Sequence, residues 1–221
     1  MKDLGDTQLR DPPPIERALI RTGIGALDEA LGGGIPRGDG LCLYFVPPTD
    51  DWSFLIMTMR AAQEDGNSVF WLGPWEPDVP RWKHYGVDPA KVMVATCNDP
   101  VDLKVKAQIV HECGADLLIV EGVSTIMNIE SSGDTFRVWK AQQNAIYNMT
   151  HRERLSNTAI IFSRALGEKY TNYPVQYASD DDISVFIDDH RPHSFKAHVL
   201  SRHSHLTSRE ISCKLPLPTR Y

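Results

Sequence analysis

The sequence lacks paired cysteines, long apolar runs and an excess of basic charge, and each absence excludes a class of protein. Its four cysteines form no CxxC pair, so neither a disulfide framework nor a zinc site is indicated. No apolar stretch approaches the roughly 20 residues of a membrane span, and the polar, proline-rich N-terminus is not typical of a signal peptide. We therefore expect a cytoplasmic protein that does not enter a membrane.

The charge balance limits the range of nucleic-acid ligands. Lys and Arg number 23 against 29 Asp and Glu, which gives a net charge of −6. This balance argues against a basic coat for non-specific nucleic-acid binding, although it allows a local basic groove.

The 221 residues are 42% hydrophobic, which is enough to form one substantial core. Residues 1–20 contain three consecutive prolines and no apolar periodicity. We expect a flexible arm or partner-binding segment there, followed by a single domain over 21–221.

Short apolar runs alternate with amphipathic stretches in the first part of the chain. The predicted strands are 41–46, 68–72, 91–95, 117–120 and 159–162, and the predicted helices are 54–64, 100–113 and 135–154. Such alternation is typical of a mostly parallel sheet. The later runs 183–187, 195–200 and 210–215 lack intervening helices, which predicts antiparallel strands extending that sheet. The predicted fold class is therefore α/β, with a mostly parallel central sheet flanked by helices and antiparallel C-terminal strands.

A glycine-rich motif, TGIGALDEALGGGIPRG, runs from Thr22 to Gly38 before the first of these strands. It resembles the segment that opens the core of RecA/KaiC-type ATPases, in which TGI..LD..LGGGIP.G precedes a strand, a phosphate-binding loop and a helix. The resemblance continues through segments in the same order to about residue 215, and it implies a RecA-like core.

The phosphate-binding loop is where the sequence departs from that family. A GxxxxGK[ST] loop surrounds phosphates with backbone N–H groups and reaches the outer ones with a lysine. Here both glycines are absent and Trp52 stands at the lysine position; the degenerate loop comprises Thr49, Asp50, Asp51, Trp52 and Ser53. Its carboxylates repel a triphosphate and an indole does not replace an ammonium, so we expect no nucleotide binding in the usual mode. A second interpretation is a tight turn that caps the next helix.

Two carboxylates stand near the family's catalytic positions. In the family, a glutamate that activates water follows the second strand, and an acidic residue that orders metal-bound water follows a later one. Glu76 and Glu121 are the corresponding candidates if the protein is active, with ATP and magnesium as cofactors; otherwise no cofactor and no metal are expected. The aromatic residues Trp75, Trp82 and Tyr85 near Glu76 are suited either to base stacking or to core packing.

Two polar segments, 129–137 and 170–182, fall where the resemblance places DNA-binding loops. The DNA-binding candidates in and around them are Arg137, Lys140, Arg164, Lys169, Tyr170, Tyr173 and Tyr177. Tyrosines interleaved with basic residues suit stacking on the unpaired bases of single-stranded DNA. The run Asp180, Asp181 and Asp182 repels phosphates, so the sequence leaves DNA contact open.

Cores of this family assemble side by side, often with an N-terminal segment on the neighbouring subunit. The intersubunit candidates are Ile15 and Leu19 in the arm, and Arg202, which remains from a trans-acting Lys/Arg pair. We therefore expect a homo-oligomer or a partner ATPase of the RecA family.

The degenerate phosphate-binding loop and the partial loss of the trans-acting Lys/Arg pair together predict a non-catalytic RecA-like protein, a pseudo-ATPase. Such a protein would bind DNA or a partner in recombination, repair or replication. One alternative is a divergent DNA-dependent NTPase that uses Ser53, Glu76 and Glu121. The other alternative is a structural or host-interaction protein that does not bind nucleic acid.

Overall fold

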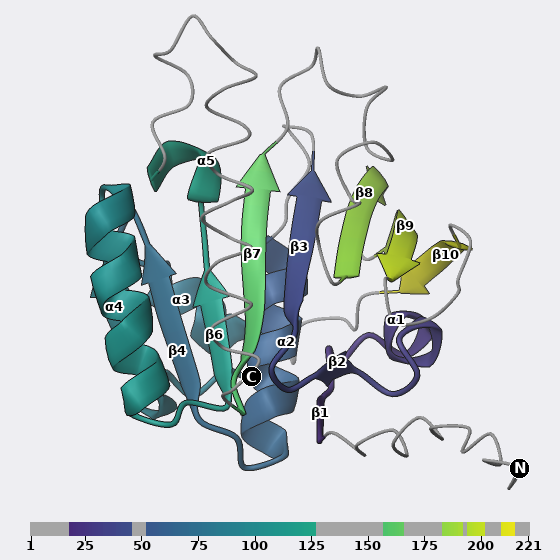
Figure 1. Ribbon diagram of the computed structural model, residues 1–221. Helices are drawn as coiled ribbons and strands as arrows, with labels where there is room; N and C mark the ends of the chain where they lie inside the picture. The colour runs from purple at the N-terminus through teal and green to yellow at the C-terminus, as the bar shows by residue number, and fades with distance from the viewer. Residues whose placement is uncertain are drawn as a thin grey trace, which may run out of the picture.

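An eight-stranded sheet forms the centre of the protein (Figure 1). The computed structural model describes residues 18–45, 52–126, 157–165, 183–191, 194–201 and 209–214. The strands, in spatial order, are β10 (Arg209–Lys214), β9 (Ser194–Ser201), β8 (Ile183–Arg191), β3 (Gly40–Phe45), β7 (Ala159–Ala165), β6 (Leu117–Val120), β4 (Val69–Gly73) and β5 (Val92–Thr96). The strands from β8 to β5 are parallel, and β9 and β10 are antiparallel. The predicted fold class is confirmed.

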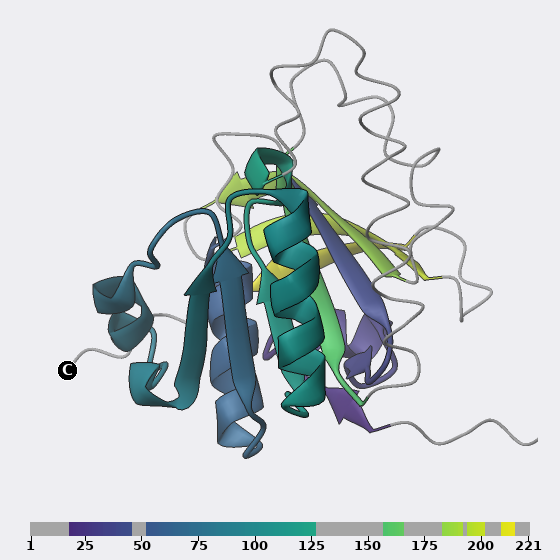
Figure 2. The same cartoon turned by 60° about the vertical axis from the view of Figure 1, so that its left-hand side comes forward.

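Helices cover both faces of this sheet. The helices on one face are α1 (Gly25–Ala30), α2 (Trp52–Glu64) and α3 (Val79–His84), and those on the other are α4 (Pro100–Glu112) and α5 (Val123–Ile126). A 3₁₀ turn, η1 (Pro89–Lys91), precedes β5. Figures 1 and 2 show α2 and α4 on opposite sides of the sheet. No helix among these described segments is both long and apolar enough to span a bilayer.

The alternation of side chains along β3 explains its unbroken apolar run. Leu41 and Leu43 belong to the core beneath α2, whereas Cys42 and Tyr44 belong to the core beneath α4. Successive side chains of a strand point to opposite faces, and both faces are covered here, so all four are buried.

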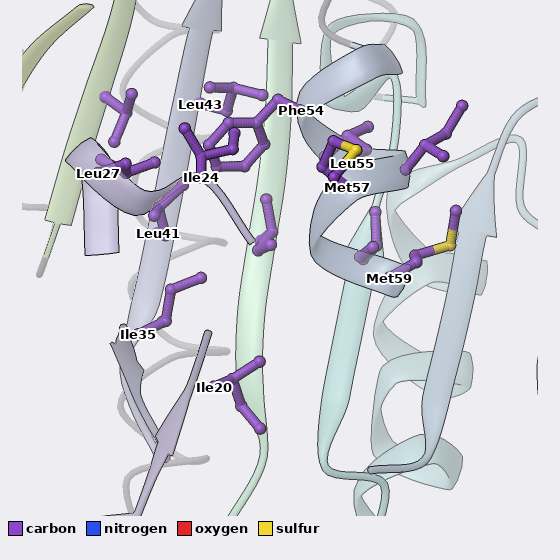
Figure 3. Packing of buried hydrophobic residues seen from close by; sticks show 14 of the residues in the cluster. Ile20, Ile24, Leu27, Ile35, Leu41, Leu43, Phe54, Leu55, Met57 and Met59 are labelled. Carbon is purple, nitrogen blue, oxygen red and sulfur yellow. The ribbon is translucent and has the colours of Figure 1, made fainter. Parts of the chain in front are cut away.

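The core on the α2 face is the larger of the two. Figure 3 shows part of this core. Phe54 and Leu55 of α2 and Leu41 of β3 are at most 1% exposed, and Leu27 of α1 closes the cluster at one side. Full burial of each such side chain stabilises the fold by about 1.5–3 kcal/mol. This layer holds α2 firmly against the sheet.

Local capping sets the beginning of α4. The Asp99 carboxylate accepts hydrogen bonds from the Val101 and Asp102 N–H groups at 2.8 and 2.9 Å, and this cap begins α4.

The predicted helix over 54–64 begins two residues earlier in the structure, at Trp52. The predicted helix over 135–154 lies outside the described residues. The sequence did not predict α1, α3 or α5, because these helices are too short to show a full apolar period.

The glycine-rich motif and the residues just before it fold into a small unit whose apolar side chains belong to the core on the α2 face. Its two-stranded antiparallel sheet pairs β1 (Leu19–Ile20) with β2 (Ile35–Pro36), and α1 lies between them in the chain. Thr22 donates its N–H and its hydroxyl to Asp28 Oδ1, both at 2.7 Å. Gly34 has φ +147°, and a Cβ there would lie 2.4 Å from the Ile20 carbonyl oxygen. The motif residues therefore have a structural role beneath α2.

A polar network joins the elements at the amino ends of the strands. Asp116 accepts hydrogen bonds from Arg37 and from the N–H and hydroxyl of Ser68 at 2.7 and 2.8 Å, and Arg37 also donates to the Asn67 side chain at 2.7 Å. Burial disfavours the Asp116 carboxylate, but these hydrogen bonds outweigh burial and hold its pKa below the ordinary value. The network fixes β2, β4 and β6 relative to one another.

Candidate functional site

The candidate site lies at the carboxyl edge, which we define as the edge of the sheet where β3, β7, β6 and β4 end. Ligands of parallel α/β proteins bind outside this edge. β6 and β7 are paired, and their carboxyl ends lie side by side. Directly after β6, Ser124 Oγ in α5 donates a hydrogen bond to the Ala165 carbonyl at the end of β7, at 3.1 Å. β3 also ends here, at Phe45, shortly before the degenerate loop in the sequence. Its residues Thr49, Asp50 and Asp51 lie outside the described residues, whereas Trp52 and Ser53 form the start of α2.

Trp52 belongs to a tryptophan cluster, which comprises Trp52 of α2, Trp71 of β4 and Trp82 of α3. The Trp52 and Trp71 ring centroids are 5.7 Å apart with the planes tilted by 44°, and those of Trp71 and Trp82 are 5.2 Å apart in an edge-to-face arrangement. Trp71 and Trp82 are fully buried, and Trp52 is half-buried. The cluster joins three elements, and offset or edge-to-face pairs are the favourable geometries for aromatic rings.

Within the described part of the chain, α3 places a cation over the Trp52 ring. The Arg81 guanidinium carbon lies 5.6 Å from the centre of the Trp52 ring, which is a cation–π contact. Asp78 caps the N-terminus of α3, and its carboxylate accepts the Arg81 N–H at 3.0 Å. The site therefore contains an indole with an arginine over it where the resemblance places the phosphate-binding lysine. Arg81 and Trp71 could not be predicted as site residues from the sequence, because their approach to Trp52 depends on the placement of α3 and β4.

Glu121 directly follows β6 and is only 4% exposed. Its N–H donates to the Leu72 carbonyl at 2.8 Å, which continues the pairing of β6 with β4. A Cβ on Gly73 would lie 2.9 Å from Glu121 Oε2 and 3.3 Å from Trp71 Nε1, so the carboxylate lies over Gly73 on the side of the tryptophan cluster. Trp71 Nε1 is buried without a hydrogen-bond partner among the described residues. Glycine at position 73 leaves room for both groups.

Glu76 differs from Glu121 in its solvent exposure. It is exposed, in the loop between β4 and α3, and its neighbour Trp75 is 55% exposed. Of the three aromatic residues considered for base stacking, Trp82 is fully buried and Tyr85 is half-buried, so Trp75 alone presents a largely exposed ring.

Arg164 lies in the interior at the end of β7 and is 3% exposed. Its guanidinium lies 5.4 Å from the centre of the Tyr44 ring and donates to the Tyr44 hydroxyl at 3.4 Å. Tyr44 in turn stacks on Phe186 with a centroid distance of 4.6 Å. The structure thus places Arg164 against Tyr44 of β3, in the interior of the fold.

The remaining sequence-derived candidates fall mostly outside the described residues. This applies to Arg137, Lys140, Lys169, Tyr170, Tyr173 and Tyr177 among the DNA-binding candidates, and to Ile15 and Arg202 among the intersubunit candidates. Leu19 lies in β1, where it is exposed and packs on Gly33. Ile126 and Ala165, which directly precede the segments 127–156 and 166–182 in the sequence, lie at the carboxyl edge.

These features define a mostly parallel α/β protein with an aromatic and acidic candidate site at the carboxyl edge of its sheet. No protein-family model matches the chain. The chain is similar to protein RecA of Malacoplasma penetrans, with 25% identity over 142 residues that cover 59% of this chain and 42% of that RecA. The chain thus matches less than half the length of this relative. The similarity supports a RecA-like relationship.

Proposed function

We propose that this chain is a non-catalytic RecA-like protein, a pseudo-ATPase, which binds DNA or a protein partner in recombination, repair or replication. The observation that carries the proposal is the position of Trp52 in the tryptophan cluster. The proposal combines this packing with the similarity to RecA and with the degenerate loop in the sequence.

The charges of the described site support this proposal. A nucleotide-binding loop needs a free ammonium that reaches the outer phosphates. Trp52 provides no positive charge, and the Arg81 guanidinium lies over the indole ring. These residues do not fit a magnesium nucleotide held in the usual mode, so we derive no hydrolytic step through one.

Isothermal titration calorimetry with magnesium ATP tests the proposal. We expect no saturable binding to the wild-type protein at millimolar nucleotide. We expect the double substitution Trp52→Lys with Asp51→Gly to raise nucleotide affinity, because it restores an ammonium and removes a carboxylate. The matched control is Asp51→Gly alone, which lacks the new ammonium.

The divergent NTPase is the alternative that this titration distinguishes. Saturable binding of ATP by the wild-type protein, weakened by Ser53→Ala, would contradict the proposal and favour the alternative. Ser53 is 5% exposed in the first turn of α2, so the unfolding midpoint of the variant must be measured beside its affinity.

A further inference from the structure

We propose that β5 is the contact strand of a homodimer, in which it pairs with β5 of a second copy of this chain around a two-fold axis. This inference goes beyond the proposed function, because it concerns self-association and does not depend on nucleotide or DNA binding. The observation that carries it is an uncharged, apolar edge of the sheet whose central backbone groups have no partner in the described part of the chain.

The two outer strands of the sheet differ in their protection against pairing. β10, at one edge, carries the exposed charged residues Glu210 and Lys214. Charged side chains commonly prevent an edge strand from pairing with another chain. β5, at the other edge, has the uncharged sequence VMVAT, and its Met93 and Val94 side chains are 45% and 43% exposed. The edge formed by β5 therefore lacks the protection that β10 has, and it is suited to pairing with a further strand.

The backbone of β5 presents alternate residues to the open edge. The Cys97 N–H, directly after the strand, donates to the Gly73 carbonyl at 2.8 Å, so Cys97 faces β4. The backbone groups of successive strand residues point to opposite sides, so Val92, Val94 and Thr96 face away from β4. Buried backbone groups need hydrogen-bond partners, and an extended strand supplies donors and acceptors at this spacing. The occupant of this edge is therefore a strand.

One end of the open edge already contacts α4. Lys106 Nζ donates to the Thr96 carbonyl, which agrees with the alternation along β5, and it also lies 2.6 Å from an Asp102 carboxylate oxygen. A carbonyl oxygen has two lone pairs, so Thr96 is able to accept a second hydrogen bond from a partner strand. The Val94 N–H and C=O, at the centre of β5, have no partner among the described residues. The centre of the strand is thus open for pairing.

The charges at the two ends of β5 favour a second copy in the antiparallel orientation. Lys91 precedes the strand with its side chain 69% exposed, 3.8 Å from Asp88, and the exposed Asp99 follows the strand. Antiparallel pairing with Val94 opposite the same residue of the second copy aligns all five residues of β5. It brings Lys91 of each copy to the strand end that Asp99 follows, whereas parallel pairing would bring the two lysines together. Opposite charges then face each other at both ends, and the two-fold contact closes at a dimer.

Disulfide cross-linking of a Val94→Cys variant of the full chain tests the inference. Opposite residues in a hydrogen-bonded antiparallel pair have Cα atoms about 5.5 Å apart, which a disulfide spans. The variant also carries Cys113→Ser, which removes the exposed native thiol. We expect it to form a covalent dimer on mild oxidation. The matched control is Val101→Cys in the same background, at a position on α4 that is 72% exposed, and it should remain monomeric on a non-reducing gel.

Sedimentation velocity measures the same contact without a cross-link. We expect the wild-type protein to form a concentration-dependent dimer. Val94→Lys should raise the dissociation constant about tenfold or more, because it places two ammonium groups opposite each other, whereas Val101→Lys should leave it unchanged. Lys91→Gln should weaken an antiparallel dimer but would tighten a parallel one, in which the lysines repel. Circular dichroism verifies that each variant is folded.

The outcomes separate this inference from the proposed function. A wild-type protein that stays monomeric at the concentrations of the cross-linking assay would overturn the inference, as would a dimer that Val94→Lys leaves intact. A dimer that dissociates in Val101→Lys but not in Val94→Lys would place the contact on α4 and would also overturn it. Each of these results leaves the titration with magnesium ATP unaffected, so the two proposals fail independently.

Discussion

Replacing Trp52 with lysine should destabilise the fold, because the indole contributes to packing. The substitution removes the Trp52–Trp71 contact, since aromatic pairs contribute about 0.5–1.5 kcal/mol beyond burial. It also removes the Arg81 contact, for which cation–π pairs at exposed sites contribute about 0.5–1 kcal/mol. With some apolar burial lost as well, we expect the free energy of unfolding to fall by about 2–3 kcal/mol.

Urea unfolding followed by far-UV circular dichroism measures this loss, since the tryptophan fluorescence itself changes on substitution. Trp52→Phe should lose less than Trp52→Lys, because the phenyl ring keeps part of both contacts. Trp75→Ala is the matched control: its side chain lies outside the tryptophan cluster and is 55% exposed, so we expect a change below about 0.5 kcal/mol. A Trp52→Lys protein as stable as the wild type would refute the view that the indole is a structural replacement for the lysine.

Three further predictions concern the rest of the fold. Hydrogen bonds hold the folded-state pKa of Asp116 below its unfolded value of about 4, so the stability that they provide is present above that pH and is lost as the pH falls. In urea titrations, Asp116→Asn should therefore lower the free energy of unfolding at pH 7. The variant should also show a smaller decline of that free energy below about pH 4. Burial raises the pKa of the Cys97 thiol to about 11 and that of the Cys213 thiol to about 12. At pH 8 a thiol reagent should therefore modify the exposed Cys113 first. Rapid labelling of either buried thiol in the native protein would contradict the described packing. Gly34→Ala should destabilise the protein more than Gly32→Ala in thermal unfolding. Both glycines have a positive φ, but a Cβ at position 34 would lie 2.4 Å from the Ile20 carbonyl oxygen, whereas a Cβ at position 32 meets nothing within 4 Å. Equal losses of stability would exclude that clash as the cause.

The strands of the sheet were predictable from the sequence because parallel strands buried on both faces form continuous apolar runs. The run Leu117 to Val120 is an example, and its four side chains are all buried. The short helix α3 was not predictable, because its six residues, VPRWKH, show no apolar period. The position of Arg81 over Trp52 depends on that helix and was missed with it.

The contacts of the site depend on the order of the strands, which the sequence pattern does not determine. Trp71 meets Trp52 because the core on the α2 face brings β4 and α2 together. Arg164 was considered for DNA binding because of its charge and its position at a strand end. Its register opposite Tyr44 in the β3–β7 pair places it in the interior, and that pairing became visible only in the sheet.

ATP turnover over a long incubation is the most direct test of the central claim that this RecA-like chain is non-catalytic. Release of phosphate should be followed with magnesium ATP, in the presence and absence of single-stranded DNA. A non-catalytic protein should release phosphate no faster than a Glu121→Gln variant prepared in the same way. Turnover by the wild-type protein that is stimulated by DNA and lost in Glu121→Gln would contradict it.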